Sequence, residues 1–332
     1  MNSEHSVERT LPPNLISALL RGFDTIANHL HLILFPLALD LFLWLGPRLS
    51  LEKLFQGMML QVFTLNGTET AEVTDLLKVS QETWMELLQR FNLFSAFSTI
   101  PVGVPSLMNG RLPVQTPAGL PATWQMGSFS SVLVLWAAFA LTGILLGTLY
   151  FKLTAQAALQ DDIAWTHTFQ HLAWSFAQVF LLTILWGILL VALSIPLSLV
   201  VSLVFSTGSW FGQLLLLLLA GFIVWLLLPL LFSAHGIFVN GLRFLASLRQ
   251  GVRLTQVTLP GTGLFFLSVF VLSQGMNLLW QIPAESSWWS LVGIFGHAFI
   301  MTALLASSFV YYRDAERWTR YLINQFRPQA VS

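Results

Sequence analysis

Apolar residues fall into uninterrupted blocks along the chain, each long enough to cross a bilayer. A membrane-spanning helix needs about 20 mostly apolar residues at a rise of about 1.5 Å per residue. Six blocks approach or exceed that length: 30–47, 129–151, 174–205, 213–234, 262–281 and 289–312. The third block is overlong and contains Pro196, which removes a backbone donor, so we expect a kink or an early helix end there. The pattern predicts an all-α polytopic integral membrane protein.

Composition agrees with that pattern and excludes a water-soluble fold of this size. Charged residues make up 9% of the 332 residues, AVILMFWYC makes up 55%, and the mean hydropathy is +0.73. A soluble domain carries about 25% charged residues. The formal net charge of +0, without a basic stretch, gives no footprint for nucleic acid. The absence of cysteine excludes disulfides, thiolate metal sites and cysteine nucleophiles.

Lysine and arginine in the short loops set the predicted orientation. Lys152, three arginines at 243, 249 and 253, and the arginines of the C-terminal tail follow the second, fourth and sixth blocks, whereas 206–212 and 282–288 carry none. We therefore expect a multi-pass protein of the cell membrane with both termini in the cytoplasm. The expected parts are a cytoplasmic N-terminus with an elbow helix (1–29), the first span (30–47), an extracytoplasmic helical cap and arm (48–128), a five-span membrane domain (129–312) and a cytoplasmic tail (313–332).

A short amphipathic stretch precedes the first, third and fifth blocks, at 15–30, 161–174 and 244–256. Each is interpreted as an elbow helix lying in the headgroup layer before a turn into the span. The arrangement predicts three hairpins of the form elbow, span out, span back. The alternative is that any cytoplasmic loop between apolar spans looks amphipathic.

The elbow-plus-span unit, the stretch LRQGVRL (248–254) and a last span ending in Tyr311-Tyr312-Arg313-Asp314 carry a resemblance. The chain is similar to bacterial six-span proteins related to the membrane domain fused to some glycerophosphodiester phosphodiesterases. The resemblance covers roughly 155–320. It implies a fold type and no activity, because the chemistry of that family belongs to a separate soluble domain. The long first loop departs from the compact pattern of the family.

The 48–128 region is the largest part expected outside the bilayer. Apolar positions at helical spacing predict one helix over 50–65, and Ser80 as N-cap begins a second one with Trp84, Leu87 and Phe91 on its apolar stripe. Five prolines and three glycines in 99–122 predict an extended, irregular arm without regular structure. The region is either a lid or docking surface for a partner, or a surface elaboration.

Polar residues at membrane depth are the candidate functional residues. Asp40 is the one formally charged residue in the six blocks, and an aspartate at the centre of a membrane helix costs about 2.5–3.5 kcal/mol. It is interpreted either as a proton or cation site or as a structural residue that reaches water near the outer interface.

Further polar groups lie in the last two blocks. Gln274, Asn277 and Gln281 share one helix face, and His297 lies in the sixth block. These residues form either a polar seam against another helix or part of a substrate path.

The remaining motifs are weak. His167 and His171 have the i, i+4 spacing that lets two imidazoles share a metal, but no third ligand is marked beyond Asp161 and Asp162. The nucleophile elbow, the Walker loop, the zincin pattern and the dinucleotide glycines are absent. We therefore expect neither cofactor nor catalysis.

Two functions are compatible with these features. The first is a non-catalytic scaffold or accessory subunit that contacts the bilayer and a protein partner through 48–128 or through 235–256. The second is a transporter or permease subunit of an exporter-type system with a separate ATPase, which would dock on 235–256.

Overall fold

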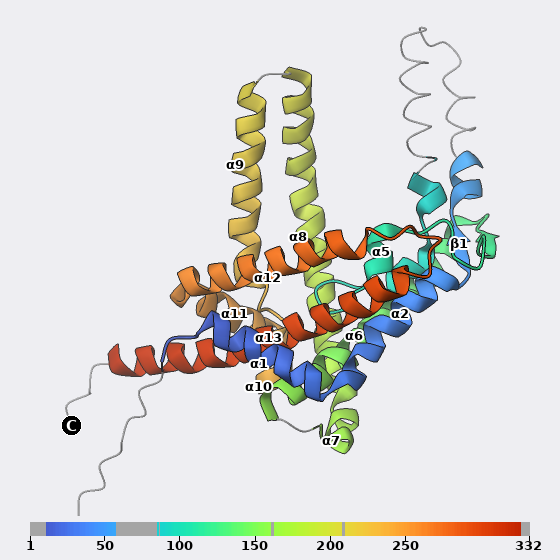
Figure 1. Ribbon diagram of the computed structural model, residues 1–332. Coiled ribbons are helices and arrows are strands. Elements are labelled where there is room, and N and C mark those ends of the chain that lie inside the picture. Colours follow the sequence, from blue (N-terminus) through green and yellow to red (C-terminus); the bar gives the residue numbers. More distant parts are fainter. Residues whose placement is uncertain (1–10, 58–84, 86, 161–162, 208–209, 327–332) are drawn as a thin grey trace, which may run out of the picture.

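The computed structural model describes residues 11–57, 85, 87–160, 163–207 and 210–326, and these are almost entirely helical (Figure 1). Two three-residue strands, β1 (Arg48–Ser50) and β2 (Thr123–Gln125), pair in parallel with Arg48 opposite Thr123. The α-helices in chain order are α1 (Leu15–Asn28), α2 (Leu34–Leu45), α5 (Leu107–Arg111), α6 (Phe129–Gln160), α7 (Trp165–Gln170), α8 (Leu172–Thr207), α9 (Trp210–Leu227), α10 (His235–Asn240), α11 (Phe244–Val257), α12 (Leu259–Trp280) and α13 (Ser290–Phe326). Three short 3-10 helices are η1 (Leu30–Ile33), η2 (Leu93–Phe97) and η3 (Leu228–Leu230).

Among the described residues, five helical segments are long and apolar enough to cross a membrane: Phe129–Gln160, Leu172–Ser202, Trp210–Asn240, Leu259–Trp280 and Ser290–Gln325. A sixth span is formed if α1 and the helix that follows it, Leu30–Leu45, are counted together, although they are bent by 91°. The predicted all-α polytopic membrane architecture is confirmed.

Of the two outcomes expected at Pro196, a kink or an early helix end, the structure excludes the early end, because α8 continues through Pro196 to Thr207. Proline removes one backbone hydrogen bond, whereas ending a helix inside a bilayer would leave several backbone groups without partners. Continuing the helix is therefore the less costly solution. The hydroxyls of Ser194 and Ser198 donate to the carbonyls of Val191 and Ile195 on either side of the proline.

Helices occupy all three predicted elbows. α1 begins at the N-cap Asn14, whose side chain accepts from the Ser17 amide at 3.1 Å, and the 91° bend follows it. α7 lies directly before α8, and α11 directly before α12, with His171 and Thr258 as the single residues between them. The order elbow, span, span therefore occurs for α7, α8 and α9 and again for α11, α12 and α13. After α1, the segment Leu30–Leu45 is long enough for a span only if it is counted together with α1.

α13 is the central helix of the protein. In its most apolar 18-residue stretch, 56% of the residues are buried, and the helix packs against α1, α2, α6 and α12. α1 lies close along it: a Cβ added to Gly22 would be 2.0 Å from Ser307 Oγ and 2.5 Å from the Ser307 backbone nitrogen. The absence of a side chain at Gly22 thus allows the two backbones to approach each other.

The hairpin of α8 and α9 makes far fewer contacts with the rest of the chain. In the most apolar 18-residue stretch of α8 only 6% of the residues are buried, and in that of the span beginning with α9 the share is 0%. Figure 1 shows the hairpin projecting away from α1, α2, α12 and α13. Its attachment lies at its base, where Val179, Leu182 and Trp186 pack on Ala234 and Ile237.

The segment from Asn92 to Leu112 packs into the helical body. Val102, Val104, Leu107 and Met108 are buried, and η2 lies along α6. Two glycines of α6 permit this approach: a Cβ on Gly143 would be 2.3 Å from the Phe97 carbonyl oxygen, and one on Gly147 would be 2.7 Å from Gly103 Cα.

The prediction that 99–122 lacks regular structure is therefore wrong in part, because α5 forms there. Ser106 caps it, since the hydroxyl accepts from the Asn109 amide at 3.0 Å. Of the two helices expected earlier in the loop, residues 52–57 and 87–90 are helical. Their other predicted residues, which include Ser80 and Trp84, lie outside the described residues.

Replacing Gly22 by alanine should lower the free energy of unfolding by about 1–3 kcal/mol, because the new methyl group would force α1 away from α13. The matched control is Gly275→Ala on α12, where a Cβ meets no atom within 4 Å. That variant should be neutral or more stable by up to about 1 kcal/mol, since alanine favours the helix. Denaturant unfolding in mixed micelles measures both, and equal stability of the two variants would contradict the close α1–α13 contact.

Candidate functional site

Asp40 lies in α2 with 0% of its surface exposed, and its carboxylate is held by the beginning of α5. Oδ1 accepts from the Ser106 hydroxyl at 2.5 Å and from the Met108 amide at 2.9 Å. Oδ2 accepts from the Leu107 amide at 3.1 Å. Both oxygens of the one charged residue predicted at membrane depth are therefore used to bind an irregular loop.

His297 on α13 approaches the same carboxylate from another direction. Its Nδ1 lies 3.6 Å from Asp40 Oδ2, which is longer than a hydrogen bond, and 4% of its side-chain surface is exposed. The His297 Nδ1 atom has no hydrogen-bond partner among the described residues. The structure thus brings together two of the predicted polar residues from helices that are more than 250 positions apart in sequence.

The geometry around Asp40 favours a structural role over a proton or cation site. A buried carboxylate is costly unless hydrogen bonds satisfy its lone pairs, and here two backbone amides and one hydroxyl do so. The structural interpretation made from the sequence supposed that Asp40 reaches water. That detail is wrong, because the side chain is enclosed by the loop.

Gln274 and Gln281 do not join this cluster. Both are exposed on α12, whose buried face carries Thr262, Phe265 and Ser273. Asn277 is half-buried, and its Oδ1 atom is buried without a hydrogen-bond partner among the described residues. The three side chains share a helix face as expected, but that face does not form a polar seam against another helix described here.

The possible metal pair is not completed by further ligands. The side chain of His167 lies outside the described residues, and His171 is exposed beside a cavity of about 440 Å³ that Lys152 also lines. Within the described part of the chain, no group of three or more His, Asp or Glu side chains could hold a metal ion.

Sequence reasoning missed the burial of Lys152. The second span was expected to end at 151, whereas α6 continues to Gln160, so Lys152 lies inside the helix with 7% of its surface exposed. Its Nζ donates to the Ser175 hydroxyl at 3.4 Å. The sequence does contain a sign of this burial, because small and apolar residues follow Lys152 and continue the helical pattern beyond it.

A second missed residue is Glu316, which joins three helices. Its Oε1 accepts from Asn240 Nδ2 of α10 at 3.0 Å, from Gln250 Nε2 of α11 at 2.6 Å and from Arg320 on its own helix. Glu316 is 7% exposed, so these donors compensate a buried charge. No sequence pattern links positions 66 and 76 residues apart, and the contacts follow only from the fold.

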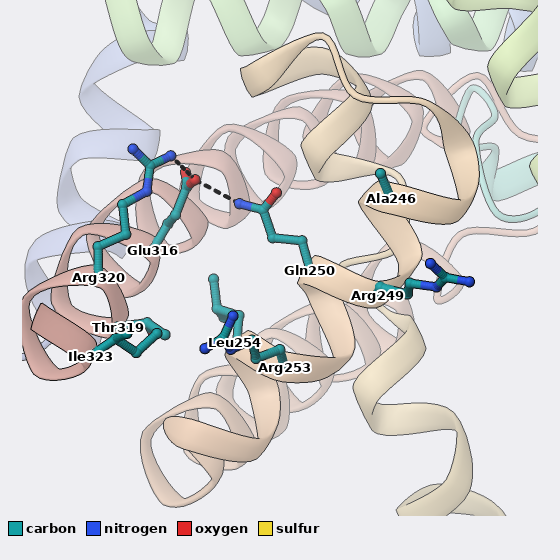
Figure 2. Close-up of a pocket in the computed structure, with 9 residues that line it drawn as sticks. All are labelled: Ala246, Arg249, Gln250, Arg253, Leu254, Glu316, Thr319, Arg320 and Ile323. Atoms are coloured by element: carbon teal, nitrogen blue, oxygen red, sulfur yellow. Dashed lines mark hydrogen bonds and ion pairs between the residues drawn. The ribbon is translucent and has the colours of Figure 1, made fainter. Parts of the chain in front are cut away.

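Beside Glu316 lies a cavity of about 500 Å³ between α11 and α13 (Figure 2). Its lining is Ala246, Arg249, Gln250, Arg253, Leu254, Glu316, Thr319, Arg320 and Ile323. Figure 2 shows Gln250 and Arg320 converging on Glu316 from opposite helices, while Arg249 points away from it. From the sequence, these arginines served only to predict orientation.

Comparison with family models, with curated proteins and with solved structures gives no match. The resemblance to the membrane domain of glycerophosphodiester phosphodiesterases therefore stays a prediction.

Replacing Asp40 by asparagine should destabilise the protein by about 3 kcal/mol, because the new amide group would place a donor against the backbone amides of the loop. Unfolding in mixed micelles measures this loss, and limited proteolysis should show new cleavage within 93–112. The graded comparison is Ser106→Ala, which removes one of the three hydrogen bonds to Asp40 and also the cap of α5, and it should cost about 1–2 kcal/mol. An asparagine variant as stable as the parent protein would contradict the structural role.

Proposed function

We propose that this chain is a non-catalytic, multi-pass protein of the cell membrane that acts as a scaffold or accessory subunit for another membrane-spanning protein. Both termini lie in the cytoplasm, and the α8–α9 hairpin is the surface that holds the partner. The observation that carries the proposal is the exposure of this hairpin, of which almost nothing is buried by the rest of the chain.

Packing in a bilayer explains why an exposed hairpin favours association. Lipid tails are as apolar as leucine, so helices associate through close packing and hydrogen bonds, with small residues at the contact. The hairpin carries Gly187 on α8 and Gly221 on α9, both exposed, and a Cβ on either would meet no atom within 4 Å. By contrast, Gly22, Gly143 and Gly147 are covered by neighbouring segments of this chain. The uncovered glycines leave room for a helix from another protein.

The orientation is supported by the distribution of arginines. Arg243, Arg249 and Arg253 lie at or in the elbow helix α11, and Arg313, Arg317 and Arg320 follow on the far end of α13. α11 and α13 line one cavity together, so these arginines gather at the same end of the protein. The positive-inside rule assigns that end to the cytoplasm.

A non-catalytic role is supported by the use of the buried carboxylates. Asp40 is saturated by the loop, and Glu316 by side chains of α10, α11 and α13. A membrane enzyme needs ionisable groups that converge at one depth and are free to exchange protons or bind substrate.

The described part of the external loop supports the hairpin over the loop as the docking surface. Arg111 donates to the Pro283 carbonyl at 2.7 Å, and the Val114 amide donates to Glu285 Oε2 at 3.0 Å. These contacts hold the loop against the turn between α12 and α13. Docking through residues 58–84 concerns positions outside the described residues and stays a prediction.

The permease subunit is the second candidate, and one observation favours it. Segment 235–256 forms α10 and most of α11. Its residues Arg249 and Arg253 are exposed, so a separate ATPase could bind to them. If this candidate holds, Asp40→Asn should abolish a measured flux while leaving the protein folded, whereas the structural role of Asp40 predicts a loss of stability. The co-purifying partner should then be a soluble ATPase.

Native mass spectrometry of the full chain, gently extracted from its own membrane, tests the proposal. The expected species contains one further membrane-spanning chain in fixed stoichiometry. The double variant Gly187→Leu/Gly221→Leu should retain at least about ten-fold less of that chain than the parent protein. The reason is that bulky groups in a packed contact cost about 1–3 kcal/mol.

The matched control is Gly263→Leu/Gly275→Leu on α12, where added side chains also meet no atom within 4 Å. This control should keep the partner, and both double variants should unfold at the temperature of the parent protein. A parent protein that carries lipid alone, or equal loss in the control, would contradict the role of the hairpin.

A further inference from the structure

We propose that the cavity between α11 and α13 is a binding site for a phosphate group, and that its ligand is the headgroup of an anionic phospholipid. This inference goes beyond the scaffold function and does not depend on the partner of the hairpin.

The cavity lies at the level where two spans leave the apolar part of the bilayer. α11 ends at Val257, and the span α12 begins at Leu259. On α13 the uninterrupted apolar run ends at Tyr312, and charged residues follow from Arg313. The lining residues Arg253 and Glu316 therefore flank the ends of apolar spans, which is the depth of the lipid phosphates.

The charge at this level is strongly positive although the whole protein is neutral. Arg243, Arg249, Arg253, Arg313, Arg317 and Arg320 lie at or in α11 and the end of α13, against two carboxylates, Asp314 and Glu316. Arg313 pairs with Asp314, and Arg320 with Glu316. Arg249 and Arg253 make no ion pair within 4 Å among the described residues, so their charges are available to an anion.

Glu316 gives the cavity fixed walls. By accepting from Gln250 of α11 and from Arg320 of α13, it links the two helices that face each other across the space (Figure 2). The Thr319 hydroxyl donates to the Ala315 carbonyl at 2.8 Å within α13. A site held by such internal bonds loses little conformational freedom when a ligand enters.

The lining is chemically matched to a lipid headgroup. Arginine binds phosphate oxygens through paired N–H donors, and Arg249 and Arg253 supply them. Ala246, Leu254 and Ile323 add an apolar surface that suits glycerol and the first methylenes of acyl chains. The volume of about 500 Å³ lies within the range of about 300–1,000 Å³ that small-ligand sites occupy. A soluble phosphate would use the arginines but not the apolar surface.

The test uses the full chain in nanodiscs that contain phosphatidylglycerol and phosphatidylcholine, with native mass spectrometry to count the lipids retained. The parent protein should retain phosphatidylglycerol in preference to phosphatidylcholine. Arg249→Gln/Arg253→Gln should lower this preference by about ten-fold or more, because each hydrogen bond lost to a charged phosphate contributes about 1.5–3 kcal/mol. Arg243→Gln/Arg317→Gln removes the same charge outside the cavity, and its preference should fall much less than that of the cavity variant, because only diffuse attraction is lost.

A second variant tests the cavity without changing charge. Ala246→Phe fills the space while all arginines remain, and it should also lose the preference for phosphatidylglycerol. Equal preference in the Arg249/Arg253 variant and in the Arg243/Arg317 control would overturn the proposal, since diffuse surface charge would then explain binding. Retained preference in the filled cavity would overturn it as well.

Inorganic phosphate at millimolar concentration distinguishes the two sources of the ligand. We expect it to leave the retained phosphatidylglycerol unchanged, because it does not contact the apolar lining. Displacement of the lipid in the parent protein would support the phosphate site and overturn its assignment to a lipid.

Discussion

The hydrogen bonds between Asp40 and the amides of Leu107 and Met108 are the interaction on which the rest of the structure depends. A backbone without helical or sheet bonds is tolerated at membrane depth only where protein satisfies its polar groups. The segment from Asn92 to Leu112 is such a backbone, and it is packed among α2, α6 and α13. The carboxylate supplies acceptors to amides at the start of α5 that have no partner inside that helix. A costly charge is thus retained because it anchors a loop that would otherwise be excluded.

Two kinds of helix contact follow from where small residues are placed. Gly22 and Gly147 allow neighbouring segments to approach closer than any side chain would permit, and they hold α1 on α13 and the loop on α6. Gly187 and Gly221 have the same chemistry but nothing over them within the chain. In water such a hairpin would collapse onto the body to bury its apolar surface. In lipid that driving force is absent, so its separation from the body is compatible with a stable fold.

The sequence predicted what depends on local pattern and missed what depends on distant pairs. Apolar blocks of sufficient length predicted the five spans from α6 to α13, and amphipathic stretches predicted the helices α1, α7 and α11. The predicted first span, 30–47, is long enough only if α1 is counted with it. Asp40 and His297 were singled out because charge is rare in the apolar blocks. No periodicity could place Ser106 against Asp40 or Gln250 against Glu316, since these contacts join segments 66 residues apart. Pro196 left two outcomes open, and the helix continues through it because losing one backbone hydrogen bond costs less in lipid than ending the helix.

The buried carboxylates Asp40 and Glu316 share one function at two different places. Each accepts hydrogen bonds from other segments of the chain and fixes them, the loop in the first case and the elbow helix α11 in the second. Because these hydrogen bonds already occupy the two carboxylates, Asp40 and Glu316 are not available to bind a ligand. What remains available lies on exposed surfaces: the arginines at the boundary beside Glu316, and the uncovered faces of α8 and α9. The interior is therefore a framework, and the functions that we propose for this protein use its exposed surfaces: binding of anionic headgroups at its edge and of other helices along its hairpin.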